Sequence, residues 1–375
     1  MKSKNFKEGV NGVASGASTK CINDQQWTKY HTKGGHGFAA EDANAQIEKW
    51  CGKCVEKVGT SNAKNGADRI VNGVEIQTKY YSSASKSVDA AFKEGVYRYS
   101  GQMLEVPKDQ YDDAVRIMRG RISNGQVPGV TDPNMAERLV IKGYYTYDEA
   151  VRIAKAGNFD SIKFDVRTQA VACVFSCGLS FVINYAAAKS NGASHEEALK
   201  LATKQAAKSG ITTMITGVSA QQLLRTQFGR NFAVVVTKAI KPAVQAALKT
   251  EVGKTVLTKT ATVVAGKRVV GVAATNVLTK AARTNAVVSS VVFIGTTIPD
   301  AVDLCRGKIS GRQFAENTTS NAASVGGGWA GTSVGAAIGT AICPGVGTII
   351  GGIVGGVGGG LGAALGVKKV FSIFK

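Results

Sequence analysis

Acidic residues are scarce in the second part of this 375-residue chain. Residues 166–375 contain 22 Lys and Arg but only six Asp and Glu, whereas residues 1–165 contain 24 basic and 20 acidic side chains. The net charge is therefore +4 in the first part and +16 in the second. We expect an ordinary soluble domain first, followed by a basic part that suits a polyanion or an anionic membrane surface.

Proline and cysteine are also scarce in this sequence, and residues 1–25 contain no long apolar stretch. Six Pro exclude a collagen-like chain and a long extended linker, although 45 Gly are present. A hydrophobic content of 44% excludes bulk disorder. Seven Cys are too few for a disulfide framework, which favours a reducing compartment. Residues 1–25 lack the apolar stretch of a secretory signal, so we expect membrane contact from internal or C-terminal segments.

The longest uncharged stretch lies towards the C-terminal end. Between Glu316 and Lys368, 51 consecutive residues include no Asp, Glu, Lys, Arg or His. Glycines recur there at four-residue spacing on both sides of Pro344-Gly345, at Gly327, Gly331, Gly335 and Gly339 and at Gly347, Gly351, Gly355 and Gly359. This spacing places glycines on one helix face, where a second helix can approach closely. Residues 316–375 are therefore predicted to form a glycine-zipper hairpin of two roughly 20-residue helices in a membrane.

A second uncharged run, residues 168–188, is just long enough for one helix to cross a hydrocarbon core of ~30 Å. Its Ser, Cys and Asn side chains equally suit a buried helix of a bundle, and both interpretations stay open. The whole of residues 168–315 is predicted to be a basic, Ala- and Val-rich helical region. Its recurring Lys and Arg are typical of a solvated or membrane-surface face.

The first part of the chain predicts an α+β domain. Residues 1–35 have no periodicity and are expected to form a flexible polar arm. Residues 36–125 predict helices at 38–58, 85–94 and 110–122 and strands at 68–71, 74–80 and 102–106. Asn72-Gly73 predicts a tight hairpin between the first two strands. Residues 126–167 predict a helical extension, so the expected fold class is an α+β domain followed by an all-α, partly membrane-embedded region.

Polar side chains gather on this predicted hairpin. Strand alternation places Glu75, Gln77 and Lys79 on one face of the second strand, and the hairpin brings Asp68 beside them. Glu41 belongs to the preceding helix. Carboxylates next to an ammonium group suit a site for Mg²⁺ and an activated water. The same alternation also describes an ordinary solvent-facing strand, and both interpretations stay open.

The segment Ile76-Gln77-Thr78-Lys79, with Asp68 upstream, resembles the restriction-endonuclease-like PD-(D/E)xK superfamily. The closest similarity is to its Mrr-like branch, in which Gln-x-Lys replaces acid-x-Lys. The order of helices and strands over residues 36–122 is also similar to the core of that family. No Pro precedes Asp68, which departs from the family pattern.

The resemblance implies particular roles for the five residues. Asp68 would ligate Mg²⁺ together with Gln77, or with Glu75 if that residue is the second acid. Lys79 would orient and help deprotonate the attacking water, and Glu41 would support the site from outside the metal's own ligands.

Two functions follow from these patterns. The first is a Mg²⁺-dependent nuclease acting on nucleic acid, with DNA as the expected substrate. It would be tethered to a bacterial inner membrane with its N-terminal domain in the cytoplasm, in phage defence or as a toxin. The alternative is a non-enzymatic glycine-zipper membrane or pore-forming protein, assembled as a homo-oligomer, with a soluble N-terminal binding domain. A soluble nucleic-acid-binding protein conflicts with the 51-residue uncharged run.

Cysteine offers a weaker signal. Cys51-Gly52-Lys53-Cys54 is a lone CxxC motif on the first predicted helix. A zinc site would have to borrow Cys21, His31 or His36 at irregular spacing, so two helix-buried cysteines are the expected outcome.

Overall fold

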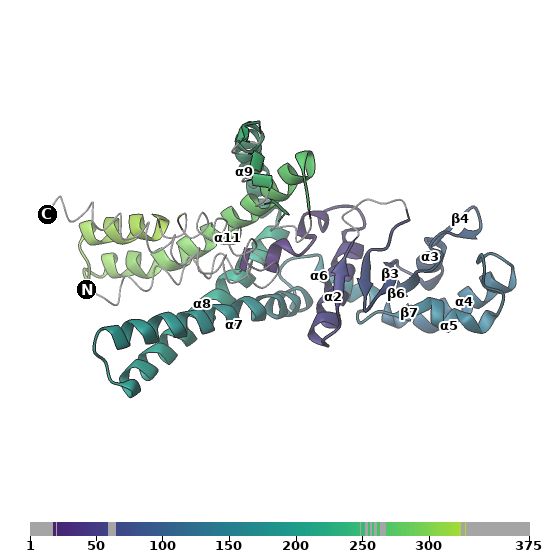
Figure 1. Ribbon diagram of the computed structural model, residues 1–375, viewed down its shortest axis with the longest axis horizontal. Helices are drawn as coiled ribbons and strands as arrows, with labels where there is room; N and C mark the ends of the chain where they lie inside the picture. The colour runs from purple at the N-terminus through teal and green to yellow at the C-terminus, as the bar shows by residue number, and fades with distance from the viewer. Residues whose placement is uncertain are drawn as a thin grey trace. The chain divides into compact units, whose positions relative to one another are not determined.

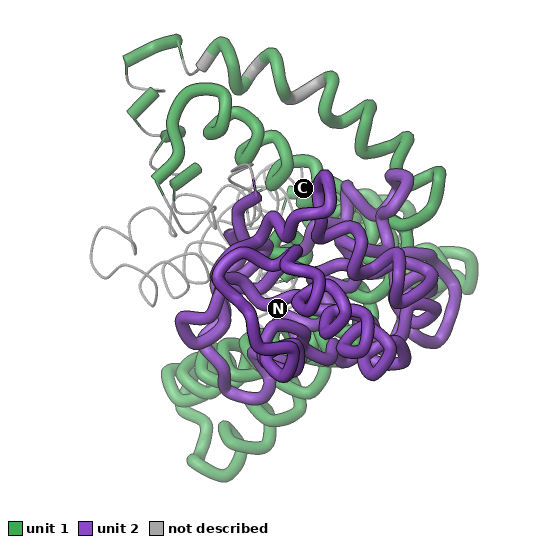
Figure 2. The backbone as a smooth tube through the Cα atoms, turned by 90° about the vertical axis from the view of Figure 1, so that its right-hand side faces the viewer, with its two compact units in different colours: residues 1–24, 165–375 green, residues 25–164 purple. Residues whose placement is uncertain are grey.

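The computed structural model describes residues 18–19, 21–58, 65–247, 249–251, 254–255, 257–258, 261–262, 268–323 and 327. The chain divides into two compact units, one of residues 25–164 and one of residues 1–24 with 165–375 (Figure 2). The first unit is α+β and the second is helical in its described part, which confirms the predicted fold class at this level. The predicted glycine-zipper hairpin lies outside the described residues, except for 316–323 and 327.

A five-stranded sheet forms the centre of the α+β unit. Its strands are, in order across the sheet, β1 (Val55–Lys57), β2 (Arg69–Val71), β3 (Val74–Thr78), β6 (Met103–Val106) and β7 (Val140–Lys142). The first three run antiparallel, and β3, β6 and β7 run parallel. Asn72 and Gly73 join β2 to β3 with φ angles of 49° and 85°, the left-handed backbone that a two-residue hairpin turn requires. β4 (Phe92–Lys93) pairs with β5 (Val96–Tyr97) in a separate ribbon.

Two groups of helices pack in this unit, and in Figure 1 the labelled strands of the sheet lie between them. The main core joins the strand residues Leu104, Val106 and Val140 to α3 (Ala84–Asp89), α4 (Tyr111–Ser123) and α5 (Ala136–Leu139). A smaller cluster joins Tyr80 to α2 (Gly35–Trp50) and α6 (Tyr147–Ile153). Short 3-10 turns occur at Trp27–Lys29, Lys108–Gln110 and Pro133–Met135.

Three features of this unit differ from the sequence prediction. The first helix ends at Trp50 because Gly52 turns the chain at φ 77°, and residues 55–57 then pair with β2 instead of continuing the helix. Cys51 and Cys54 are consequently exposed rather than buried in a helix. The segment predicted as an arm includes the 3-10 turn, where Trp27 and Tyr30 are buried. β7 forms within the segment predicted to be a helical extension. Its three residues are too few to show a two-residue period, so the sequence did not indicate this strand.

Long helices make up the described part of the second unit. They are α7 (Phe159–Ser190), α8 (His195–Arg225), α9 (Gln227–Ala247) and α11 (Gly271–Cys305), within the region predicted to be helical. A capping box of Ser194 and Glu197 begins α8 and satisfies its first backbone N–H groups. α11 packs against both α8 and α9.

Candidate functional site

Three predicted site residues meet where β2 begins and β3 ends. Asp68 directly precedes β2, and its carboxylate accepts hydrogen bonds from Gln77 Nε2 at 2.7 Å and from Thr78 N at 2.8 Å. The backbone of Asp68 also continues the hairpin ladder, because its N–H donates to Ile76 O at 2.9 Å. Lys79 follows β3 and places its Nζ 5.1 Å from the centroid of the Tyr99 ring, a cation–π contact. The hairpin therefore fixes Asp68 and Gln77 in direct contact.

Glu41 joins this group from α2. Its carboxylate accepts a hydrogen bond of 2.6 Å from Gln26 Nε2. Burial and the nearby Asp68 carboxylate raise the pKa of Glu41 to about 8, against the opposing effects of Gln26 and Lys79. Burial also raises the pKa of Asp68, and Lys79 with the two hydrogen bonds to Asp68 opposes this shift. Two carboxyl groups and one ammonium group thus interact in a partly desolvated place. We call Glu41, Asp68, Gln77 and Lys79 the polar cluster.

Glu75 does not join the polar cluster. It lies at the exposed start of β3, where it is the Cα partner of Ile70 on β2. Burial on β3 increases only from Ile76 onwards. The sequence placed Glu75 on the same strand face as Gln77, but the structure leaves its side chain in solvent.

The donor atoms of the polar cluster fit a hard divalent cation. Gln77 Oε1 is buried and has no hydrogen-bond partner among the described residues, although its Nε2 is held by Asp68. Mg²⁺ needs only one or two protein carboxylates, and water completes its coordination. In the described part of the chain, no group of three His, Cys, Asp or Glu side chains could hold a metal ion, which leaves Cys51 and Cys54 without a zinc site there.

A buried charged network that the sequence did not predict lies on the same hairpin. Arg69, 1% exposed, donates to Glu48 at 2.8 and 3.0 Å and to Glu105 at 2.5 and 3.0 Å. Burial lowers the pKa of Arg69, but Glu105 and Glu48 outweigh this effect and raise it above its ordinary value. Thr78 and Asn44 complete the network by donating to Glu105. The signal in the sequence is a single acid, Glu105, inside an otherwise apolar strand.

The second unit places polar side chains between its helices. Ser176 of α7 lies 2.5 Å from Ser209 of α8, Gln169 donates to Gln221 at 2.6 Å, and Arg225 pairs with Asp165. The residues of α8 that meet α7 are small, namely Ser209, Gly210, Thr213 and Gly217. Other small residues of α8 are also buried, namely Ala198, Ala202, Ala206 and Ala220. Close approach of two helices through small and hydroxyl-bearing residues is typical of membrane helices.

Apolar side chains of α7 and α11 point outwards instead. Both helices are long and apolar enough to cross a membrane, and only 22% and 18% of their most apolar stretches are buried. The predicted span, residues 168–188, lies inside α7. Large exposed apolar residues include Val171, Val174, Phe175 and Val182 on α7 and Ile294, Ile298 and Val302 on α11. This is the reverse of a soluble helix, which buries its apolar face.

Comparisons with known proteins match parts of the chain. The profile of the YeeR C-terminal domain matches residues 18–123, and that of the C13G5.2-like glycine zipper domain matches residues 308–366. Inner membrane protein YeeR of Escherichia coli (strain K12) is 52% identical over 99 residues, which are 25% of this chain and 19% of that protein. The chain thus covers about a fifth of the length of this relative. No solved structure matches the chain.

These matches contradict the nuclease prediction. The profile that covers Asp68, Gln77 and Lys79 describes the C-terminal domain of YeeR, and the relative that carries this name is an inner membrane protein. Neither matching profile belongs to the PD-(D/E)xK superfamily. The predicted roles in phage defence or as a toxin, and the predicted nucleic-acid partner, have no support. The findings favour the alternative, a non-enzymatic glycine-zipper membrane protein.

The predicted membrane association is confirmed. The relative is an inner membrane protein, the glycine-zipper profile matches the uncharged C-terminal run, and two described helices are apolar enough to span a bilayer. The chain is therefore a membrane-associated protein.

Proposed function

We propose that this chain is a non-enzymatic inner-membrane protein whose helices associate in the bilayer and whose α+β unit is a binding module in the cytoplasm. The outward apolar face of α7 carries the proposal. In water, exposed apolar surface costs about 25 cal/mol per Å². In lipid that cost disappears, and the hydrogen bonds of Ser176 and Gln169 to α8 become the favourable contacts between helices.

The cytoplasmic placement of the α+β unit rests on cysteine chemistry. Cys51 and Cys54 are exposed and unbridged on this unit. Exposed thiols three residues apart persist in a reducing compartment and are readily oxidised outside it. The reaction of Cys51 and Cys54 with an impermeant maleimide tests this: labelling only after the inner membrane is broken supports the cytoplasmic side, and labelling of intact spheroplasts contradicts it.

A charge placed on the exposed face of α7 tests the membrane proposal. Val174 is 71% exposed, so Val174→Lys is harmless in water. In the middle of a bilayer a lysine costs about 3 kcal/mol. We expect Val174→Lys to lower the amount of full-length chain that stays in membranes after alkaline carbonate washing. The matched control is Val96→Lys, because Val96 is 48% exposed on the α+β unit and should tolerate the change. Equal retention of both variants, or release of the wild-type chain by carbonate, would contradict the proposal.

The glycine-zipper segment is proposed to bring copies of the chain together. Its support is the matching profile and the four-residue spacing of glycines. Gly331→Leu with Gly351→Leu fills two of these positions, and we expect it to remove cross-linked oligomers in native membranes. Dye-loaded liposomes distinguish a pore from a tight assembly: wild-type chain that releases dye, with no release by the double variant, supports a pore.

The binding module offers one specific ligand. We propose that the polar cluster binds a divalent cation, with Mg²⁺ as the expected ion, because Gln77 Oε1 lacks a partner among the described residues and lies beside two carboxyl groups whose pKa values burial raises. A bound dication would add to the positive charge that Lys79 and Arg69 already provide beside Asp68. We expect MgCl₂ to raise the thermal unfolding temperature of the full chain in detergent. Asp68→Asn should remove this rise, whereas Glu75→Gln, outside the cluster, should keep it. A rise that survives Asp68→Asn contradicts the proposal.

A further inference from the structure

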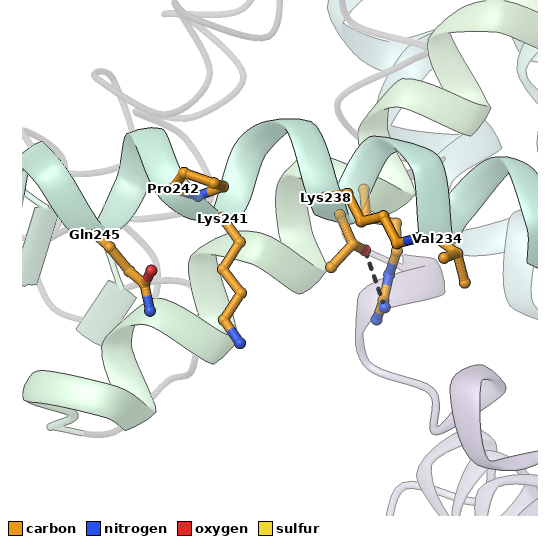
Figure 3. Close-up of a pocket in the computed structure, with 7 residues that line it drawn as sticks. Val234, Lys238, Lys241, Pro242 and Gln245 are labelled. Atoms are coloured by element: carbon orange, nitrogen blue, oxygen red, sulfur yellow. Dashed lines mark hydrogen bonds between the residues drawn. The ribbon is translucent and has the colours of Figure 1, made fainter.

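A cavity of about 550 Å³ opens between α9 and α11. Six of its lining residues come from α9, namely Val234, Thr237, Lys238, Lys241, Pro242 and Gln245, and Arg283 comes from α11 (Figure 3). In Figure 3 the side chains of Lys241 and Gln245 extend to the same side of α9. The volume is within the range of small-ligand sites, about 300–1,000 Å³, and exceeds that of a single small ion.

The lining of this cavity is positively charged. Its described residues include three cations and no acid. In the part of the chain that the structure describes, neither Lys238 nor Lys241 is paired with a carboxylate. Like charges that line one cavity repel one another, so an anion bound between them is stabilised.

Hydrogen bonds position the third cation. Arg283 NH1 donates to Thr237 Oγ1 at 3.4 Å, and the Thr237 hydroxyl itself donates to Ala233 O at 2.7 Å. The hydroxyl proton therefore points away from Arg283, and its lone pairs face the guanidinium. A partly fixed guanidinium with two lysines opposite is a combination that recognises phosphate oxygens.

The sequence around the cavity has almost no negative charge. Residues 226–299 contain ten Lys and Arg and a single acid, Glu251. The positive charge of this part of the sequence therefore extends well beyond the lining.

The position of the cavity along α11 fits the surface of a bilayer. Directly after Arg283, residues 284–299 contain no charged side chain. A helix that crosses a membrane with this run places Arg283 at the level of the headgroups. α9 is amphipathic, and its exposed Phe228 and Val235 suit a helix lying in the same interface.

We propose that this cavity binds a phosphate-bearing anion, which at the membrane is the headgroup of an anionic phospholipid. Lys238, Lys241 and Arg283 are the contacts to the phosphate, and Val234 with Pro242 contacts the apolar part of the lipid next to it. The identification of the bound anion as a lipid headgroup rests on the membrane location proposed above, whereas the proposal of an anion site does not.

The test uses purified full-length chain in a non-ionic detergent and titration calorimetry with three probes. Short-chain phosphatidylglycerol carries a net negative phosphodiester, short-chain phosphatidylcholine carries the same group neutralised by choline, and inorganic phosphate has no lipid part. We expect phosphatidylglycerol to bind more tightly than phosphatidylcholine. Lys238→Gln with Lys241→Gln should weaken it about tenfold or more, because each lysine near an anionic phosphate contributes about a factor of five. The control, Lys249→Gln with Lys254→Gln, removes the same charge from exposed positions outside the lining and should change affinity less than twofold.

The probes separate the two sources of the anion. Binding of phosphatidylglycerol alone, lost in the lining variant, supports a lipid site. Binding of inorganic phosphate with the same dependence on Lys238 and Lys241 supports a site for soluble anions. This form of the proposal holds even if alkaline carbonate releases the chain from membranes. No binding of either anion, or equal weakening by the lining and control pairs, overturns the proposal.

Discussion

Glu41 is held in its protonated form near neutral pH by its surroundings. Its pKa is about 8 in the folded chain and 4.5 ordinarily, so folding takes up a proton between these values. Stability therefore falls as pH rises from about 4.5 through about 8. Asp68, whose pKa is also raised, contributes with the same sign.

Glu41→Gln should remove most of this pH dependence. The variant keeps a neutral side chain at every pH, so its unfolding temperature should change less between pH 5 and pH 8 than that of the wild type. The difference corresponds to on the order of 3 kcal/mol across the window. Thermal unfolding of the full chain in detergent measures it. The exposed Glu75→Gln should retain the wild-type slope, and parallel profiles for Glu41→Gln and wild type would contradict the assignment.

Arg69 holds two buried carboxylates, and its removal leaves both without their cation. Arg69→Met should lower the free energy of unfolding by about 3–5 kcal/mol, the usual cost of breaking a buried ion pair from one side. Chemical denaturation followed by tyrosine and tryptophan fluorescence measures the loss. Arg116→Met removes an exposed pair with Asp113 and should cost less than about 1 kcal/mol. Similar effects of the two changes would show that the buried network adds no stability.

The polar cluster and the charged network show what a sequence reveals about single side chains. The Asn72-Gly73 turn and the two-residue period of β3 were sufficient to bring Asp68 next to Gln77, because both are local rules. The Arg69 network joins residues up to 61 positions apart, as in the Asn44–Glu105 hydrogen bond. Such pairing depends on which strands become neighbours, and no local pattern contains that information.

At the scale of helices and strands, the close contact of α7 with α8 depends on a glycine, which has no side chain to separate the two helices. A Cβ atom at Gly217 would lie 2.2 Å from Gln169 Oε1, and Gln169 is the residue that donates to Gln221. At Gly178 of α7, a Cβ atom would meet nothing within 4 Å.

The two glycines therefore predict opposite effects of the same substitution. Gly217→Ala should destabilise the chain by about 1–3 kcal/mol, because Gln169 must move and loses its partner. Gly178→Ala should be neutral or stabilising by up to about 1 kcal/mol, because alanine is the better helix former. The thermal unfolding temperature of the two variants in detergent measures the sign, and destabilisation by Gly178→Ala would contradict the open space seen at that position.

Elements with a clear period were predictable, and short or interrupted ones were not. The helix at 110–122 and the strands at 68–71, 74–80 and 102–106 correspond to α4, β2, β3 and β6. β1 and β7 have three residues each and gain their structure only from pairing with Val71 and Leu104. The length of α7 was also underestimated. The predicted span was bounded by the uncharged run that begins at Thr168, whereas the helix continues through the charged residues before it and begins at Phe159.

At the scale of the whole chain, residues 18–24 belong to the helical unit although they precede the α+β unit. Lys280 Nζ of α11 donates to Asn23 O at 2.8 Å, and Asn285 Nδ2 donates to Thr19 Oγ1 at 3.2 Å. Ile22 between these contacts is fully buried.

Deleting residues 1–24 should therefore destabilise the helical unit. The loss of Ile22 burial and of both hydrogen bonds amounts to about 3 kcal/mol or more. Asn23→Ala should have little effect, because Lys280 binds the backbone oxygen that this change retains. Protease resistance of α11 in detergent measures both variants, and unchanged resistance after the deletion would contradict the packing.

The contact between Asn23 and Lys280 also sets an order for biosynthesis. Its two partners are 257 positions apart, and a ribosome adds about 5–20 amino acids per second, so roughly 10–50 s separate their emergence. Residues 25–164 are complete well before α11 exists and can fold during this interval. Asn23 must therefore wait for Lys280, and the contact that joins them forms only after the intervening 25–164 unit has been made.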